Sequence, residues 1–400
     1  MKAIYLKSLY VFLLVLFLDW SAQGKDQDWK CGIDSFTLFR SHRNRPEWAR
    51  PVIRDNKVYV ASSRGKIAVF DKEKGTDLGL IELQAGALST PGIEDGRIYL
   101  GMDDGFFRCL EIETGTEVWS YAVNCLSISE PALSEELVIF QTGRDIVQAL
   151  SKETGEWVWS YHHERRQDLA IFGLSPPLAR DGAVYIGLSD GYIAALESDN
   201  GKEIWKTRAF TSGKYRDIDA RLSLDDNAVY ATSYAGETAA LSRRTGMVYW
   251  IYPEGGLARA CVNEKDEKDG KEDGGKIYIA TMDEKVVALN KMVGMKVWEK
   301  EFRKQARPLI NINLPSMKDK TESPVGKRVK DENWFIAVEI VEDDLVVQDR
   351  LGKFFILDPE DGALRKTIKK GRNLSSPMTI EQDNAYFLSN KGYLYKVRLK

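Results

Sequence analysis

The most concentrated run of potentially functional side chains lies between residues 211 and 221. Lys214, Arg216, Asp217, Asp219 and Arg221 place five charges of both signs within eight residues. Carboxylates and guanidinium groups at this density could pair with an incoming chain segment. Such a run is also typical of a solvated rim. Both interpretations stay open, with Arg216, Asp217, Asp219 and Arg221 as candidate partner-binding residues.

The three histidines, His42, His162 and His163, offer little catalytic chemistry. A metal site would need further ligands converging on the His162-His163 pair, and no spacing in the sequence indicates them. We therefore predict a solvated loop there. The sequence contains neither a Gly-x-Ser-x-Gly nucleophile turn nor a phosphate-binding Gly-rich motif. These observations predict no catalytic residue, no metal site and no cofactor, so we expect that the chain is not an enzyme.

The first residues are typical of an export signal. Lys2 and Lys7 precede an apolar run and then small residues, which predicts a signal peptide over 1–24 and a mature domain over 25–400. A permanent membrane anchor is the alternative. Losing this segment takes the formal net charge from −3 to −4, which favours neither nucleic acid nor an anionic membrane as a partner. No cysteine directly follows the apolar run, so we expect no lipid anchor.

Four cysteines are present, and their spacing resembles neither a metal site nor a redox motif. An exported chain could form disulfides, but a chain of this length buries enough core to fold without them. Their pairing is left open. The cysteines are Cys31, Cys109, Cys125 and Cys261.

A repeat must position any functional side chains. A turn glycine recurs every 40 to 48 residues, except for the last interval, and a tryptophan follows four residues later in five of the seven copies. A period near 40 to 45 residues is typical of a β-propeller blade, whereas an open β-solenoid has shorter repeats. We expect the tryptophans to wedge between adjacent blades. The glycines are Gly75, Gly115, Gly155, Gly201, Gly246, Gly294 and Gly362.

Eight β-rich runs predict an all-β, eight-bladed propeller of four-stranded blades. The last blade ends at Lys400 after only its third strand, and an unpaired edge strand invites aggregation. We therefore expect an N-terminal strand to complete that blade, with Phe36–Ser41 as the candidate. The runs are 58–60, 98–100, 138–140, 184–186, 229–231, 277–279, 345–347 and 385–387.

Two segments interrupt the period and are predicted to be surface excursions. They are 263–275, which is charged and Gly-rich, and 303–333, which is rich in Lys, Pro and Ser. Function often lies in such loops. A general periplasmic module that binds peptide or glycan through these two inserts is therefore one alternative function.

The repeats resemble those of the pyrroloquinoline quinone repeat family, and the whole arrangement is similar to the BamB outer-membrane protein assembly factors. Two local motifs sharpen this resemblance. Leu169 and Ile171 match apolar positions of a segment that contacts BamA in that family, while Phe172 stands where the family has arginine. Asp217-Ile218-Asp219 is similar to the family's Asp-x-Asp near the same contact surface. The lack of a lipid-anchor cysteine departs from the family.

The resemblance implies a non-catalytic periplasmic scaffold that aids the assembly of β-barrel outer-membrane proteins. Its partners would be a BamA-like barrel assembly protein and unfolded outer-membrane proteins. It would be a monomer at the inner face of the outer membrane, held there only through its partner. A pyrroloquinoline-quinone- and calcium-dependent dehydrogenase is the remaining alternative. The implied partner-binding residues are Leu169, Ile171, Phe172, Arg216, Asp217, Asp219 and Arg221.

Overall fold

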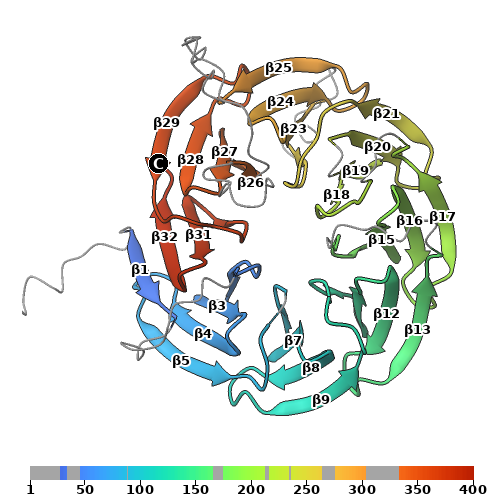
Figure 1. Ribbon diagram of the computed structural model, residues 1–400, viewed down its shortest axis with the longest axis vertical. Coiled ribbons are helices and arrows are strands. Elements are labelled where there is room, and N and C mark those ends of the chain that lie inside the picture. Colours follow the sequence, from blue (N-terminus) through green and yellow to red (C-terminus); the bar gives the residue numbers. More distant parts are fainter. Residues whose placement is uncertain are drawn as a thin grey trace, which may run out of the picture.

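Eight antiparallel sheets of four strands each stand in a ring (Figure 1). The computed structural model describes residues 28–33, 46–87, 89–164, 174–211, 216–233, 236–263, 275–302 and 333–400. The predicted eight-bladed β-propeller is therefore confirmed, and each of the eight predicted runs lies in the second strand of a blade. The predicted signal peptide lies outside the described residues. Within those residues, no helix has the length and apolar character needed to cross a membrane.

Each blade begins with its innermost strand and ends with its outermost one. Blades one to three are β2 (Val52–Arg54), β3 (Lys57–Ser62), β4 (Lys66–Asp71) and β5 (Asp77–Glu82); β6 (Gly92–Glu94), β7 (Arg97–Gly101), β8 (Phe106–Glu111) and β9 (Glu117–Ala122); β10 (Ala132–Leu133), β11 (Leu137–Gln141), β12 (Ile146–Ser151) and β13 (Trp157–His162). Blades four to six are β14 (Leu178–Arg180), β15 (Ala183–Gly187), β16 (Tyr192–Glu197) and β17 (Glu203–Arg208); β18 (Ser223–Leu224), β19 (Ala228–Thr232), β20 (Thr238–Ser242) and β21 (Val248–Tyr252); β22 (Cys261–Val262), β23 (Lys276–Ala280), β24 (Lys285–Asn290) and β25 (Lys296–Glu301). Blade seven is β26 (Phe335–Val341), β27 (Asp344–Asp349), β28 (Lys353–Leu357) and β29 (Leu364–Lys369), and blade eight is β30 (Thr379–Glu381), β31 (Asn384–Ser389), β32 (Tyr393–Arg398) and β1 (Trp29–Gly32).

The second and third strands of each blade form the core. In blade four, all five residues of β15 are buried, because the neighbouring blades cover both faces of the sheet. Such a strand is a continuous apolar run rather than an alternating one. The outermost strand β17 shows the opposite pattern, with Trp205 buried between exposed neighbours. Burial therefore decreases from the second and third strands to the rim of the propeller.

The predicted tryptophan wedges join neighbouring blades. Trp119 of blade two lies against Gly155 of blade three, where an added Cβ would lie 2.5 Å from the indole ring. Its indole Nε1 also donates to the carbonyl oxygen of Lys152 at 3.0 Å. Gly155 has a φ of +74°, which glycine adopts without strain. The same contact recurs at Trp159–Gly201, Trp205–Gly246, Trp250–Gly294 and Trp298–Gly362.

An N-terminal strand completes blade eight, as predicted, but Trp29–Gly32 forms it. This strand, β1, runs antiparallel to β32 and lies beside it in Figure 1. The predicted segment Phe36–Ser41 lies outside the described residues. A Cβ added to Gly75 of blade one would lie 2.5 Å from the Trp29 ring, the same distance as at the Trp119 wedge. Trp29 therefore supplies the tryptophan of blade eight from the opposite end of the chain.

All four cysteines are free thiols.

Candidate functional site

The described end of one predicted partner-binding segment lies next to the other segment. Leu169, Ile171 and Phe172 are outside the described residues, but the chain is described again from residue 174. Ser175 donates through Oγ to the carbonyl oxygen of Ala220 at 3.0 Å. Ala220 belongs to the charged segment 216–221. The chain that follows the apolar segment is therefore bonded to the charged segment of the next blade.

Ile218 anchors the charged segment on blade four. Its side chain is buried, and its backbone nitrogen donates to the carbonyl oxygen of Leu188 at 3.4 Å. A Cβ on Gly187, the last residue of β15, would lie 2.5 Å from Ile218 and 3.1 Å from Ser175. Glycine at this position leaves room for both segments over the same strand end. We call this surface the blade-four loop face; it comprises 163–164, 174–175, 188–191 and 216–221.

The aspartates of this face are more buried than the residues of a solvated rim would be. Asp217 is only 1% exposed, and Asp145 nearby is also buried. Burial, together with the carboxylates of Asp217 and Asp145, raises the pKa of Asp219 to about 7. Asp145 accepts hydrogen bonds from Ser189 and from Gln141. The solvated-rim interpretation is therefore wrong for Asp217, because the loop folds back onto blades three and four.

His163 also departs from its predicted place in a solvated loop. Its side chain is 5% exposed, and Nε2 lies 2.9 Å from Oδ1 of Asp190 in the turn between β15 and β16. Its ring packs beside Tyr192, with the centroids 5.4 Å apart. His162 lies at the surface, where Nε2 is 3.1 Å from the Ser160 hydroxyl. The described end of the connection from blade three is thus fastened to blade four.

Arg221 leaves the loop face and points toward the centre of the ring. It donates to Oε1 of Glu130 at 2.9 Å, and Arg50 donates to the same oxygen at 2.7 Å. Burial alone would raise the pKa of Glu130, but the two guanidinium groups hold it below its usual range. These residues come from blades one, three and five. Sequence reasoning missed both Arg50 and Glu130.

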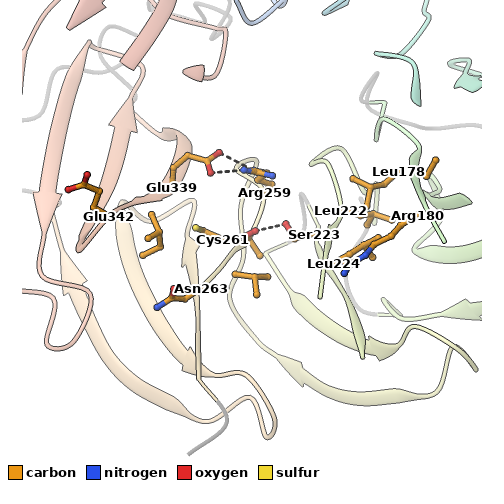
Figure 2. Close-up of a pocket in the computed structure, with 14 residues that line it drawn as sticks. Leu178, Arg180, Leu222, Ser223, Leu224, Arg259, Cys261, Asn263, Glu339 and Glu342 are labelled. Atoms are coloured by element: carbon orange, nitrogen blue, oxygen red, sulfur yellow. Dashed lines mark hydrogen bonds and ion pairs between the residues drawn. The ribbon is translucent and has the colours of Figure 1, made fainter. Parts of the chain in front are cut away.

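A second ion pair joins blades six and seven beside this cluster. Arg259 binds both carboxylate oxygens of Glu339, with Nε–Oε1 at 3.0 Å and Nη2–Oε2 at 2.5 Å. Figure 2 shows the two side chains pointing toward each other. They lie at a cavity of about 520 Å³ among the innermost strands of blades four to seven. We call Arg50, Glu130, Arg221, Arg259 and Glu339 the channel charge cluster.

Strand register gives the signal that could have revealed this cluster. Val52, Ala132, Ser223 and Cys261 pair with equivalent residues of their second strands. Two positions earlier in the same blades stand, in order, Arg50, Glu130, Arg221 and Arg259. Side chains two residues apart lie on the same face of a strand. Charged residues at one repeat position therefore meet at the centre of a ring.

The described residues fit a quinone cofactor with calcium poorly. In the described part of the chain, no group of three or more His, Cys, Asp or Glu side chains is arranged to hold a metal ion. Aliphatic and polar side chains both line the cavity, and its guanidinium groups, on Arg180 and Arg259, are each paired with a carboxylate. Pyrroloquinoline quinone carries three carboxylates, which exceed the positive charge that the channel charge cluster leaves unbalanced. We derive no step through this cofactor.

An eight-bladed ring closed by its own N-terminal strand, with a loop face over blade four, defines a repeat propeller of the pyrroloquinoline quinone type. A family model described as outer membrane protein assembly factor BamB matches residues 20–124 and 63–267. The chain belongs to this family.

Curated relatives match part of the chain. Outer membrane protein assembly factor BamB of Yersinia pestis is 28% identical over 136 residues, which cover 32% of each chain. BamB of Legionella pneumophila is 24% identical over 232 residues, covering 56% of this chain and 51% of its own. The matches thus span a third to a half of the length of these relatives.

Solved structures match nearly the whole chain but show the fold alone. BamB from Moraxella catarrhalis superposes with a TM-score of 0.72 at 20% identity, covering 94% of this chain and 99% of its own. A quinohemoprotein alcohol dehydrogenase from Comamonas testosteroni has a TM-score of 0.66 at 12% identity, covering 94% and 76%. Propellers named as enzymes and as assembly factors share this architecture, so function must be argued from the site.

Proposed function

We propose that this protein is a non-catalytic periplasmic scaffold that aids the assembly of β-barrel outer-membrane proteins. It docks on a BamA-like partner through the blade-four loop face and the adjoining segment with Leu169, Ile171 and Phe172. Family membership over residues 20–267 supports the assembly role. In this proposal it reaches the inner face of the outer membrane through that partner.

The bond between Ser175 and Ala220 is the observation that carries the docking surface. It ties Ser175, three residues after Phe172, to the charged segment. Interfaces gain most of their affinity from a few apolar or aromatic side chains near their centre, and polar groups around them set orientation. We assign affinity to Leu169 and Ile171, with Phe172 beside them. Arg216 supplies a charge at the edge of the surface.

The two aspartates take a different role in this proposal. Because Asp217 is buried, reversing its charge would disturb the packing of the loop as well as any docking contact. In this proposal Asp217 and Asp219 belong to the packed loop, which Ile218 holds on blade four while Arg221 fastens its end to Glu130. Charge reversal of the aspartates is therefore an unsuitable test, and the apolar residues offer a cleaner one.

The test is an affinity pull-down of the tagged chain, starting at Lys25, from detergent-solubilised envelopes of the source bacterium, with mass spectrometry of the bound proteins. The double variant Leu169→Asp with Ile171→Asp is expected to lose the BamA-like protein by at least tenfold. A matched control, Met292→Asp with Met295→Asp, changes two exposed apolar residues on blade six and should retain it.

Thermal unfolding of both variants checks that the propeller remains folded. Recovery of a BamA-like protein by the original chain and the control, but not by the loop variant, supports the proposal. If no barrel assembly protein is recovered, or if both variants recover it equally, the docking surface is wrong.

A further inference from the structure

The cavity in the ring centre has the size and lining of a small-molecule site. Its volume of about 520 Å³ lies within the range of ligand pockets, roughly 300 to 1,000 Å³. Half-buried aliphatic side chains line it from four neighbouring blades, together with Arg259 and Glu339 (Figure 2). The aliphatic residues are Leu178, Leu224, Val262 and Ile340.

The channel charge cluster carries more positive than negative charge. It has three guanidinium groups and two carboxylates. Arg50 and Arg221 share one oxygen of Glu130, whereas Arg259 occupies both oxygens of Glu339. Within this cluster one positive charge is left without a balancing carboxylate. A charge in a poorly solvated site is costly unless a partner compensates it.

Arg221 is the guanidinium group of the cluster whose charge is least compensated. Its Nε is buried and has no hydrogen-bond partner among the described residues. Burial lowers its pKa, Arg50 and Arg259 add repulsion, and Glu130 only partly opposes them. Arg259 remains 38% exposed in its side chain despite its pairing with Glu339. Of the three guanidinium groups, that of Arg259 lines the cavity, and Arg221 directly precedes Leu222 in its wall.

We propose that the central channel binds a ligand that joins one carboxylate to a small apolar group. One negative charge balances the excess of the cluster, and a planar carboxylate matches the donor geometry of a guanidinium group. A doubly charged phosphate would reverse the imbalance rather than cancel it. The apolar group packs against Leu178, Leu224 and Ile340. A free carboxylic acid and the carboxyl end of a peptide share this chemistry.

This inference does not depend on the proposed docking function, because the channel and the segment with Leu169 and Ile171 are separate. The test uses N-acetyl-leucine and its matched neutral analogue, N-acetyl-leucinamide, titrated by calorimetry and ligand-observed NMR at low salt. Chloride and phosphate are left out because they would compete. The acid is expected to bind saturably, and the amide at least tenfold more weakly. Equal binding of both, or no binding of the acid at millimolar concentration, would overturn the proposal.

The source of the carboxylate is distinguished with acetyl-Ala-Ala-Leu in its free-acid and amidated forms. A free-acid tripeptide that binds tenfold better than N-acetyl-leucine supports the site and identifies a peptide end as its ligand. Equal affinity also supports the site and identifies a small acid.

A variant tests whether the cluster itself is the site. Arg259→Gln with Glu339→Gln removes the guanidinium without leaving its carboxylate unpaired, and we expect at least tenfold weaker binding of the acid. The control Lys296→Gln with Glu299→Gln removes an ion pair from the outermost strand of blade six, whose residues do not line the cavity, and should bind as the original chain does. Unchanged binding by the channel variant would overturn the assignment.

Two further variants keep the result interpretable. If the double channel variant does not fold, Arg259→Lys keeps the charge but loses the two-pronged contact, and a several-fold loss is expected. The docking variant Leu169→Asp with Ile171→Asp should bind N-acetyl-leucine with unchanged affinity. A failed pull-down can then be distinguished from a failed channel site.

Discussion

The rim of the propeller repeats one contact, whereas the side chains at the centre vary among the blades. At the rim, a tryptophan lies on the turn glycine of the next blade in six of the eight junctions, including Trp29 on Gly75. At the centre, one register position holds Arg50 in blade one, Thr90 in blade two and Glu130 in blade three. Repeated positions maintain the ring. Positions that depart from the repeat are the ones available for binding.

The two regions also differ in the energy that holds them. The rim contact combines apolar burial of an indole with one hydrogen bond to the neighbouring blade, and it depends little on pH. The centre relies on partly buried ion pairs, whose strength depends on charge balance. Three predictions test the rim contact, the closure of the ring and the buried carboxylates of the blade-four loop face, in order of decreasing expected effect.

Gly155→Ala tests the rim contact directly. The new Cβ would lie 2.5 Å from the Trp119 ring, and residue 155 would keep a φ of +74°. We therefore expect the free energy of unfolding to fall by about 3 kcal/mol, from backbone strain and overpacking together. Gly182→Ala is the matched control, because Gly182 has a φ of +75° but nothing within 4 Å of an added Cβ. It should cost about 1 kcal/mol. Equal urea midpoints for the two variants would show that the wedge contributes nothing.

Trp29→Ala tests the closure of the ring. Trp29 is partly buried against Gly75 and Tyr386, so its loss should cost about 2 kcal/mol and free strand β1 from β32. Trp157→Ala removes an exposed tryptophan from the outer strand of blade three and should leave stability nearly unchanged. Thermal unfolding and hydrogen exchange at residues 393–398 measure both effects. Protection of these residues that survives Trp29→Ala would contradict a closing role for this side chain.

The pH dependence of stability tests the blade-four loop face and has the smallest expected effect. The folded chain holds the proton of Asp219 up to about pH 7, whereas an unfolded aspartate releases it near pH 4. The folded state therefore binds more protons between these values, and the contribution of Asp219 to stability falls as pH rises from about 4 to 7. Asp219→Asn should remove this slope, worth about 1 kcal/mol because Asp219 is partly exposed. Asp199→Asn, at an exposed turn, is the control. A slope that is unchanged in Asp219→Asn would contradict the close approach of the Asp145, Asp217 and Asp219 carboxylates.

Much of the fold could be predicted because its signals are local. The turn glycines require a positive φ wherever they occur, and eight β-rich runs recur with them, so the eight blades could be counted in the chain. The closing strand was predicted at Phe36–Ser41, whereas Trp29–Gly32 forms it. Trp29 carried the better signal, since a tryptophan was missing from blade eight.

The predicted site could be located only in part. The position of 169–171 stays a prediction, although Ser175 at the described end of that connection does contact the segment 216–221. His163 was expected in a solvated loop, and a solvated rim was one of two interpretations for Asp217, yet both side chains are buried. Their burial depends on blade four, whose Asp190 lies 27 residues from His163 in the chain.

The sequence by itself determined the number of blades, the turns and the tryptophan wedges, because each depends on residues within one repeat or on its neighbour. Only the tertiary structure decided the channel charge cluster. Glu130 meets Arg50 across 80 residues and Arg221 across 91. No local spacing brings these side chains together. They meet because closing the ring places the starts of all innermost strands around one axis, where partly buried opposite charges pair.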